Sequence, residues 1–142
     1  MGYWGNGGGK RAYHHTAPIN ALYGLHEALV LLQDEGLDNS WRRHALNHQA
    51  LKAGLEAMGL ELPVDPACRL PQLNVVKIPE GIDDGAVRTA LLTEYSLEIG
   101  AGLGAGAGKV WRIGLMGHAS SKKNVILCLT ALDSVLTRMG AP

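Results

Sequence analysis

A single arginine, Arg112, lies in a short apolar segment and is the residue most capable of specific chemistry. Alternation along residues 110–116 predicts a strand with Trp111 and Ile113 on one face and Arg112 on the other. A guanidinium among apolar neighbours requires an anionic partner, and its planar fork suits a carboxylate held by two hydrogen bonds. The partner is either a ligand carboxylate or a structural acid such as Glu98 or a carboxylate across an interface.

A second polar group precedes the first predicted helix. Tyr13, His14, His15 and Thr16 place two hydroxyls and two imidazoles directly before that helix. Side chains of this kind at a helix N-terminus are suited to donate hydrogen bonds to an anion. The alternative is an ordinary helix N-cap at Thr16 with incidental neighbours.

Residues 100–108 form a run of glycines and alanines that resembles phosphate-binding loops only in part. A dinucleotide-binding loop needs a helix directly after it, whereas a strand-like segment follows here. The dipeptide Gly108-Lys109 is like the end of a P-loop, but Val110 stands where a magnesium-binding Ser or Thr is needed. We therefore expect a flexible connection between two strands, not a nucleotide site.

Histidines and cysteines do not predict a metal site or a nucleophile. His44 and His48 are four residues apart on one predicted helix face, but two ligands do not make a metal site. Surface histidines are the better interpretation. Cys128 lies near the apolar face of the last predicted helix, where a small buried side chain is expected.

The elements that position these residues follow from hydrophobic periodicity. A first helix runs from Thr16, with Pro18 in its first turn, to a stop at Gly36, and its many apolar positions predict burial on more than one side. A second helix starts at residues 38–40 and ends at Gly59. Its apolar stripe is predicted to contain Trp41, Ala45, His48, Leu51, Leu55 and Met58.

The remaining segments alternate between strands and helices. Strands are predicted at 73–78, 97–99 and 110–115, with helices from Asp83 or Asp84 to Glu94 and from Ser120 or Ser121 to Met139. This order predicts an α+β fold: a small open sheet of three to four mainly antiparallel strands with helices on one face, preceded by two long helices.

Composition limits the classes of function. The 142 residues carry 13 Lys plus Arg and 13 Asp plus Glu, a formal net charge of zero, so a general nucleic-acid or anionic-membrane binder is not expected. No apolar run is long enough to span a bilayer, and the N-terminus lacks the pattern of a secretory signal. With two widely spaced cysteines, Cys68 and Cys128, we expect a reduced, cytoplasmic protein.

Four separated motifs resemble one known family. They are YHHTAP at 13–18, GLDNSWR at 36–42, GLG at 102–104 and GKVWRIGLMG at 108–117. In this order they resemble the alanine–glyoxylate/serine–pyruvate aminotransferases, which are class V, fold-type I pyridoxal-phosphate enzymes. The resemblance covers only their C-terminal part. It implies a glycine-rich arm at 1–15, a C-terminal small domain at 16–142, and the absence from this chain of the large domain with the lysine that holds the cofactor.

The resemblance also implies roles for three residues. Arg112 matches the arginine that binds the substrate α-carboxylate, and Tyr13 and Thr16 match residues that bind the cofactor phosphate of the other subunit. No lysine of this chain matches the Schiff-base lysine, so no catalytic residue is assigned, and no metal is implied.

The function implied is transfer of the amino group of alanine or serine to glyoxylate or pyruvate by a pyridoxal-phosphate-dependent homodimer. The chain alone is expected to be inactive. Two alternatives remain: another class V enzyme, desulfurase-like or kynureninase-like, or a non-catalytic dimerisation module. Neither Cys68 nor Cys128 has the loop setting of a desulfurase cysteine, which argues against that activity.

Overall fold

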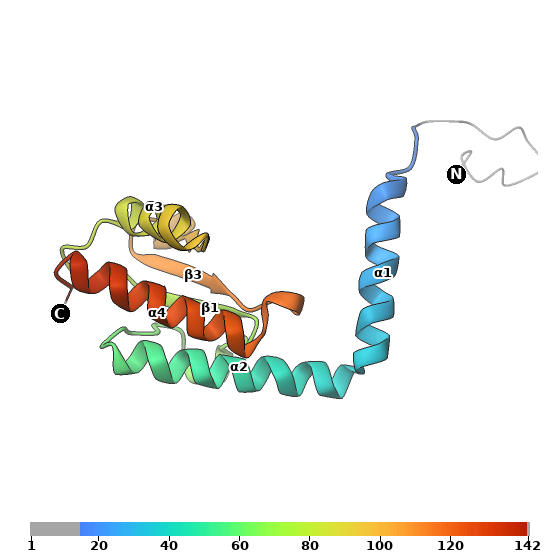
Figure 1. Ribbon diagram of the computed structural model, residues 1–142, viewed down its shortest axis with the longest axis horizontal. Coiled ribbons are helices and arrows are strands. Elements are labelled where there is room, and N and C mark those ends of the chain that lie inside the picture. The colour runs from blue at the N-terminus through green and yellow to red at the C-terminus, as the bar shows by residue number, and fades with distance from the viewer. Residues whose placement is uncertain (1–14, 142) are drawn as a thin grey trace, which may run out of the picture. The chain divides into compact units, whose positions relative to one another are not determined.

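The computed structural model describes residues 15–141 and divides the chain into two compact units between Leu37 and Asp38 (Figure 1). The first unit contains one long helix, α1, at Ile19–Glu35. Gly36, at a φ of 81°, ends it as predicted and donates its N–H to the Leu32 carbonyl. The prediction of Thr16 as N-cap is wrong. The helix starts three residues later, after Pro18, and no side chain caps it.

The expected burial of α1 on more than one side is also wrong. No residue of the helix is buried. Its large apolar side chains at Ile19, Leu22, Tyr23, Leu25, Leu29 and Leu31 are all exposed. Periodicity shows that a helix has an apolar face, but only a packed neighbour can cover that face.

Helix α2, Leu37–Ala57, lies close to its predicted bounds, and all of it after Leu37 belongs to the second unit. Its buried residues are Ser40, His44, Asn47, Leu51 and Leu55. The predicted stripe is correct at Leu51 and Leu55 but wrong in the first half, where Trp41 is 58% exposed. The buried face there carries polar residues, which a search for apolar periodicity passes over.

The sheet has three antiparallel strands in the order β1-β3-β2. Strands β1, Leu73–Lys77, and β3, Val110–Gly114, match the prediction. The strand predicted at 97–99 is wrong, because β2 is Gly100–Ala101. Ser96 ends the preceding helix in the left-handed region, at a φ of 51°, and the Leu97 N–H still donates to the Leu91 carbonyl. Strand pairing therefore starts only at Gly100.

Two further helices pack beside the sheet, each started by a side-chain cap. Helix α3, Asp84–Tyr95, begins after Asp83, whose carboxylate accepts from the Ala86 N–H. Helix α4, Lys122–Arg138, begins after Ser121, whose hydroxyl accepts from the Asn124 N–H. Short 3-10 turns lie at Pro66–Cys68 (η2), Gly104–Gly106 (η3) and Gly117–Ala119 (η4).

One hydrophobic core joins the three helices of this unit to one face of the sheet. Val76 of β1, Trp111 and Ile113 of β3, and buried residues of α2, α3 and α4 belong to a single cluster. The opposite sheet face, with Val75 and Arg112, is only half-buried. The α+β class with a small antiparallel sheet and helices on one face is thus confirmed.

Candidate functional site

Arg112 lies on the half-buried face of the sheet, between the two other strands. It is paired with Val75 of β1 and with Gly100 of β2. Its Nε donates to the Ala101 carbonyl over 2.7 Å. Among residues 15–141 it forms no ion pair, with Glu98 or any other acid. This side chain is therefore a guanidinium whose charge has no acidic counterpart in the described structure.

Gly100 leaves room for that guanidinium. A Cβ added at Gly100 would lie 3.2 Å from Nη2 of Arg112 and 3.5 Å from its Cζ. Because the pair is directly opposite in the ladder, the arginine side chain extends across β2 to reach Ala101. With Nε bonded to that carbonyl, the Nη1–Nη2 end remains as the edge that can hold a carboxylate bidentately.

The neighbouring Trp111 anchors β3 to helix α3. Trp111 is fully buried, and its indole N–H donates to Asp84 Oδ1 over 3.0 Å. Arg88 donates to the same carboxylate over 2.8 and 3.1 Å. The hydrogen bond from Arg88 is the main cause that lowers the pKa of Asp84, and the Trp111 bond adds to it against partial desolvation. The anion at Asp84 thus fixes the strand that carries Arg112.

A polar cluster that the sequence did not reveal lies just after β3. Buried His44 of α2 accepts the Gly117 N–H at Nε2 over 3.1 Å, and its Nδ1 lies 2.7 Å from the Ser40 carbonyl. The prediction of a surface histidine is wrong for His44. The signal available in the sequence was the polar series Ser40, His44, Asn47 at helical spacing.

The glycine run forms a compact connection between strands. Gly102 packs against the Gly106 carbonyl so closely that an added Cβ would overlap it. Strand β3 follows the run, and no helix begins there. A dinucleotide-binding loop requires a helix N-terminus directly after its glycines, and this run lacks one. The expectation that the run is no nucleotide site therefore agrees with the structure.

The predicted phosphate-binding pair is only partly within the described residues. Tyr13 lies outside residues 15–141, while Thr16 is exposed and lies three residues before α1. Thr16 borders a surface hollow with the first residues of α1, and that helix has no acidic residue in its first turn. The electrostatics of this end of α1 favour an anion.

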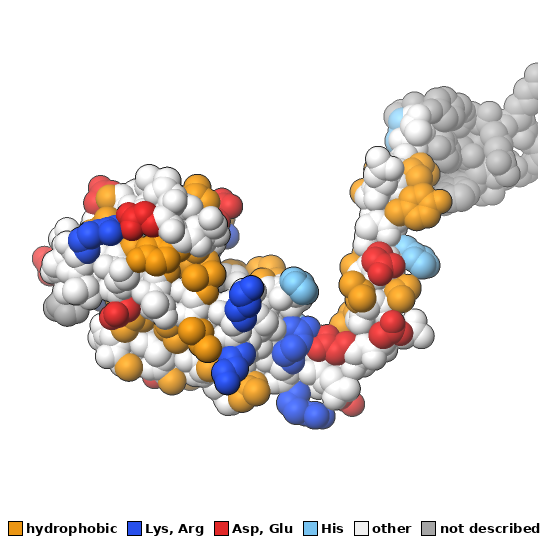
Figure 2. Space-filling view, in the orientation of Figure 1, with side chains coloured by type: hydrophobic (Ala, Val, Ile, Leu, Met, Phe, Trp, Pro, Cys, Tyr) orange, Lys and Arg blue, Asp and Glu red, His pale blue; other side chains and the backbone are white. Residues whose placement is uncertain are grey.

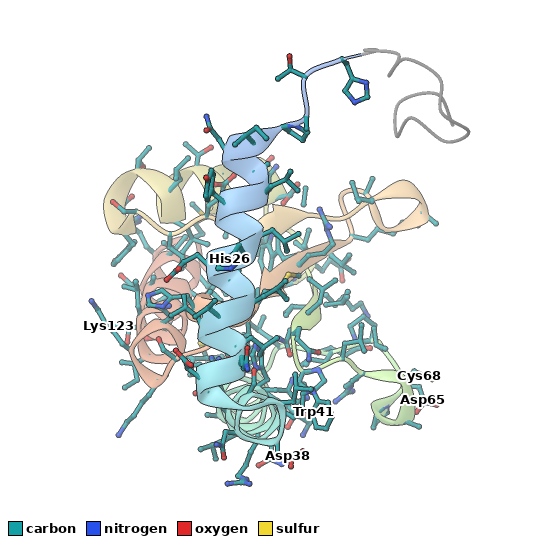
Figure 3. All side chains as sticks on the ribbon, turned by 90° about the vertical axis from the view of Figure 1, so that its right-hand side faces the viewer. His26, Asp38, Trp41, Asp65, Cys68 and Lys123 are labelled. Atoms are coloured by element: carbon teal, nitrogen blue, oxygen red, sulfur yellow. The ribbon has the colours of Figure 1, made fainter. Side chains whose placement is uncertain are left out.

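His48 and the two cysteines have different surroundings. The His48 ring forms a hydrogen bond with Asn74 Oδ1 over 2.6 Å. His48 and Cys68 line a cavity of about 140 Å³. Cys68 is exposed and lies on the η2 segment beside Asp65 (Figure 3). Cys128 is buried, and burial raises the pKa of its thiol to about 12. No group of three metal-ligating side chains occurs among the described residues.

Known proteins resemble the chain over nearly its whole length. It is 42% identical to the (S)-ureidoglycine–glyoxylate transaminase of Bacillus subtilis, over 98% of this chain and 33% of that protein. It is 46% identical to the alanine–glyoxylate aminotransferase of Callithrix jacchus, over 94% of this chain and 32% of that protein. The crystal structure of the alanine–glyoxylate aminotransferase of Nostoc superposes with a TM-score of 0.84 at 51% identity, covering 94% of this chain and 35% of that one.

The chain thus spans about a third of the length of these relatives. No protein-family model matches it. No helix of the described residues is long and apolar enough to cross a membrane. The fold and these relatives identify the chain as a homologue of the C-terminal part of the class V alanine–glyoxylate aminotransferases.

Proposed function

We propose that this chain is the substrate-carboxylate-binding part of a pyridoxal-phosphate-dependent aminotransferase that moves an amino group from alanine or serine to glyoxylate or pyruvate. One observation carries the proposal: Arg112, half-buried on the outer sheet face, has no acidic partner among residues 15–141. A half-buried guanidinium held by a backbone carbonyl suits an α-carboxylate, which both donor and acceptor substrates carry.

The residues present fit two fragments of the ligands of such an enzyme. Arg112 suits the carboxylate of an amino or 2-oxo acid. Thr16, beside a helix end without acidic residues, suits a phosphate, and we propose that Thr16 and Tyr13 together bind the cofactor phosphate of a second subunit. The cofactor, when bound, supplies stabilisation of the carbanion at the substrate Cα.

The role of this chain in catalysis is then orientation. The Nη edge of Arg112 holds the carboxylate, while Ala101 fixes the guanidinium through Nε. Fixing the carboxylate restricts rotation of the substrate and directs its Cα–H bond toward a cofactor held by another part of the enzyme. No residue of this chain is assigned the proton transfer or the covalent bond to the cofactor, so the chain by itself is proposed to be inactive.

We further propose that the enzyme is a homodimer, because the proposed phosphate site at Thr16 serves the opposite subunit. We also propose a cytoplasmic location. The second point is supported by two free thiols, one exposed at Cys68 and one buried at Cys128.

The test is a chimera in which this chain replaces the corresponding third of the Bacillus subtilis transaminase. Transfer of amino groups from alanine, serine and ureidoglycine to glyoxylate is measured after cofactor loading is confirmed by absorbance. Glyoxylate-dependent transfer is expected. A folded, cofactor-loaded chimera without transfer to any 2-oxo acid contradicts the proposal.

The isolated chain serves as the matched control. Treatment with pyridoxal phosphate and borohydride is expected to leave no specific lysine adduct. A stoichiometric adduct at one lysine would contradict the assignment of the covalent step to another part of the enzyme.

A further inference from the structure

The turn η4 that follows β3 is held to helix α2 by side chains of that helix. Arg43 Nη1 donates to the carbonyls of Gly117 and Ser120 over 2.8 and 2.7 Å. Asn47 Nδ2 donates to the Ser120 hydroxyl over 3.2 Å, and His44 Nε2 accepts the Gly117 N–H over 3.1 Å. Gly117 adopts a φ of +53°, which places its N–H toward the helix at low conformational cost.

Within this set, His44 is the one side chain whose hydrogen-bonding capacity depends on pH. Its Nδ1 lies 2.7 Å from the Ser40 carbonyl, an acceptor, so Nδ1 carries the proton. Its Nε2 faces the N–H of Gly117, a donor, so Nε2 carries none. The two contacts together require the neutral imidazole in one tautomer.

Protonation of His44 removes the second contact. An imidazolium has a donor at both nitrogens, so Nε2–H would oppose the Gly117 N–H. Because His44 is only 6% exposed, water has little access to relieve that opposition. The turn must then move away from α2, or the ring must rotate and leave the Ser40 carbonyl.

We propose that His44 is a pH-sensitive latch: its neutral ring holds η4 against α2, and protonation releases the turn between the Arg112 strand and helix α4. Histidine is the side chain that ordinarily changes its charge near neutral pH, and this makes the contact sensitive to pH. The inference concerns contacts within the second unit and stands independently of the proposed transferase function.

The charged or titratable residues on the elements that meet at this turn are mostly basic. They are Arg43 of α2, His118 of η4, and Lys122 and Lys123 at the start of α4, whose first turn contains no acid. Figure 2 shows Lys and Arg side chains with one His gathered over this region of α2 and α4. The acid of the first turn of α2, Asp38, lies six residues before His44.

The test uses NMR on the uniformly ¹⁵N-labelled 142-residue chain at pH 8 and pH 5. At pH 8 the His44 Nε2 resonance should have the shift of an unprotonated ring nitrogen, and the Gly117 amide should be protected from exchange. At pH 5, after correction for intrinsic exchange, Gly117 should lose about fivefold or more of its protection. The Val76 and Leu132 amides in the core report global stability.

Variants separate the latch from other titrating groups. His44→Gln, which cannot titrate, should abolish the pH dependence at Gly117, whereas His48→Gln and His118→Gln should leave it unchanged. The proposal is overturned if Nε2 is protonated at pH 8, if Gly117 protection is the same at both pH values, or if Val76 and Leu132 lose protection to the same extent as Gly117. It is also overturned if His118→Gln removes the effect.

Discussion

Arg112 and Gly100 face each other across the β2–β3 ladder, and the missing side chain at Gly100 leaves the space in which the guanidinium lies. A Cβ at Gly100 would lie 3.2 Å from Nη2 of Arg112. The same geometry lets Nε reach the Ala101 carbonyl. The arginine is thereby held by the backbone of a neighbouring strand, and its outer edge is available to a ligand.

Replacing Arg112 with Gln in the chimera should weaken substrate binding. A hydrogen bond to a charged group contributes about 1.5–3 kcal/mol, so KM for the amino donor should rise by about 10- to 150-fold. KM for glyoxylate should rise in the same direction, since it too has a carboxylate. Steady-state kinetics with both substrates measure this change.

The matched control is Arg138→Gln. Arg138 is exposed and pairs with Glu94 at the surface, so its loss should leave KM unchanged. Equal kinetics for Arg112→Gln and the parent chimera would remove Arg112 from the site.

Removing the Asp84 carboxylate should destabilise the fold through Trp111. In Asp84→Ala, the indole N–H of a fully buried tryptophan loses its acceptor, at a cost of about 1–3 kcal/mol in free energy of unfolding. Asp84→Asn keeps an oxygen for the indole and should cost less. Urea unfolding followed by tryptophan fluorescence compares the two, and a larger loss in Asp84→Asn would contradict this account.

The same carboxylate should make stability depend on acid pH. Its pKa is lowered in the folded chain, first by the Arg88 hydrogen bond. A lowered folded-state pKa gives a stabilisation that is present above about pH 4 and is lost as pH falls through the folded-state value. The difference in unfolding midpoint between the parent chain and Asp84→Asn should therefore shrink between pH 6 and pH 2. A difference that stays constant over this range would exclude the pairing as its source.

The two cysteines should react at very different rates. Cys68 is exposed, whereas burial raises the pKa of the Cys128 thiol to about 12. At pH 8 iodoacetamide should modify Cys68 alone, as measured by mass spectrometry, and Cys68→Ser should react only after denaturation. Rapid labelling of native Cys68→Ser would show that the core around α4 is open.

Burial of Cys128 should also make stability depend on alkaline pH. Because the raised pKa belongs to the folded state, the contribution of Cys128 to stability is present below pH 9.0 and is lost as pH rises toward about 12.

Substitution of Gly102 should disturb the connection before β3. A Cβ there overlaps the Gly106 carbonyl, so Gly102→Ala must shift backbone and should cost about 1–3 kcal/mol. Gly85→Ala is the control, since its Cβ would make only an ordinary contact at 3.4 Å with Asp83. Chemical denaturation of both variants provides the comparison. Equal stability of the two would show that the loop adapts freely.

The sequence predicted most elements because their signals are local. Gly36 ended the first helix, Asp83 and Ser121 capped later helices, and alternation around Arg112 gave the correct strand faces. The second strand was misplaced because Leu97 and Ile99 alternate like a strand although Leu97 still closes the end of α3.

The residue types and spacing alone determined that a cation stands on the outer face of a strand and that the chain has the motifs of a transaminase family. Tertiary structure decided what surrounds those residues. It left the apolar face of α1 uncovered, turned Ser40, His44 and Asn47 inward, and gave Arg112 a carbonyl in place of an acid. The physical reason is that periodicity records the direction of a side chain along its own element, whereas burial and hydrogen-bond partners depend on segments distant in the sequence.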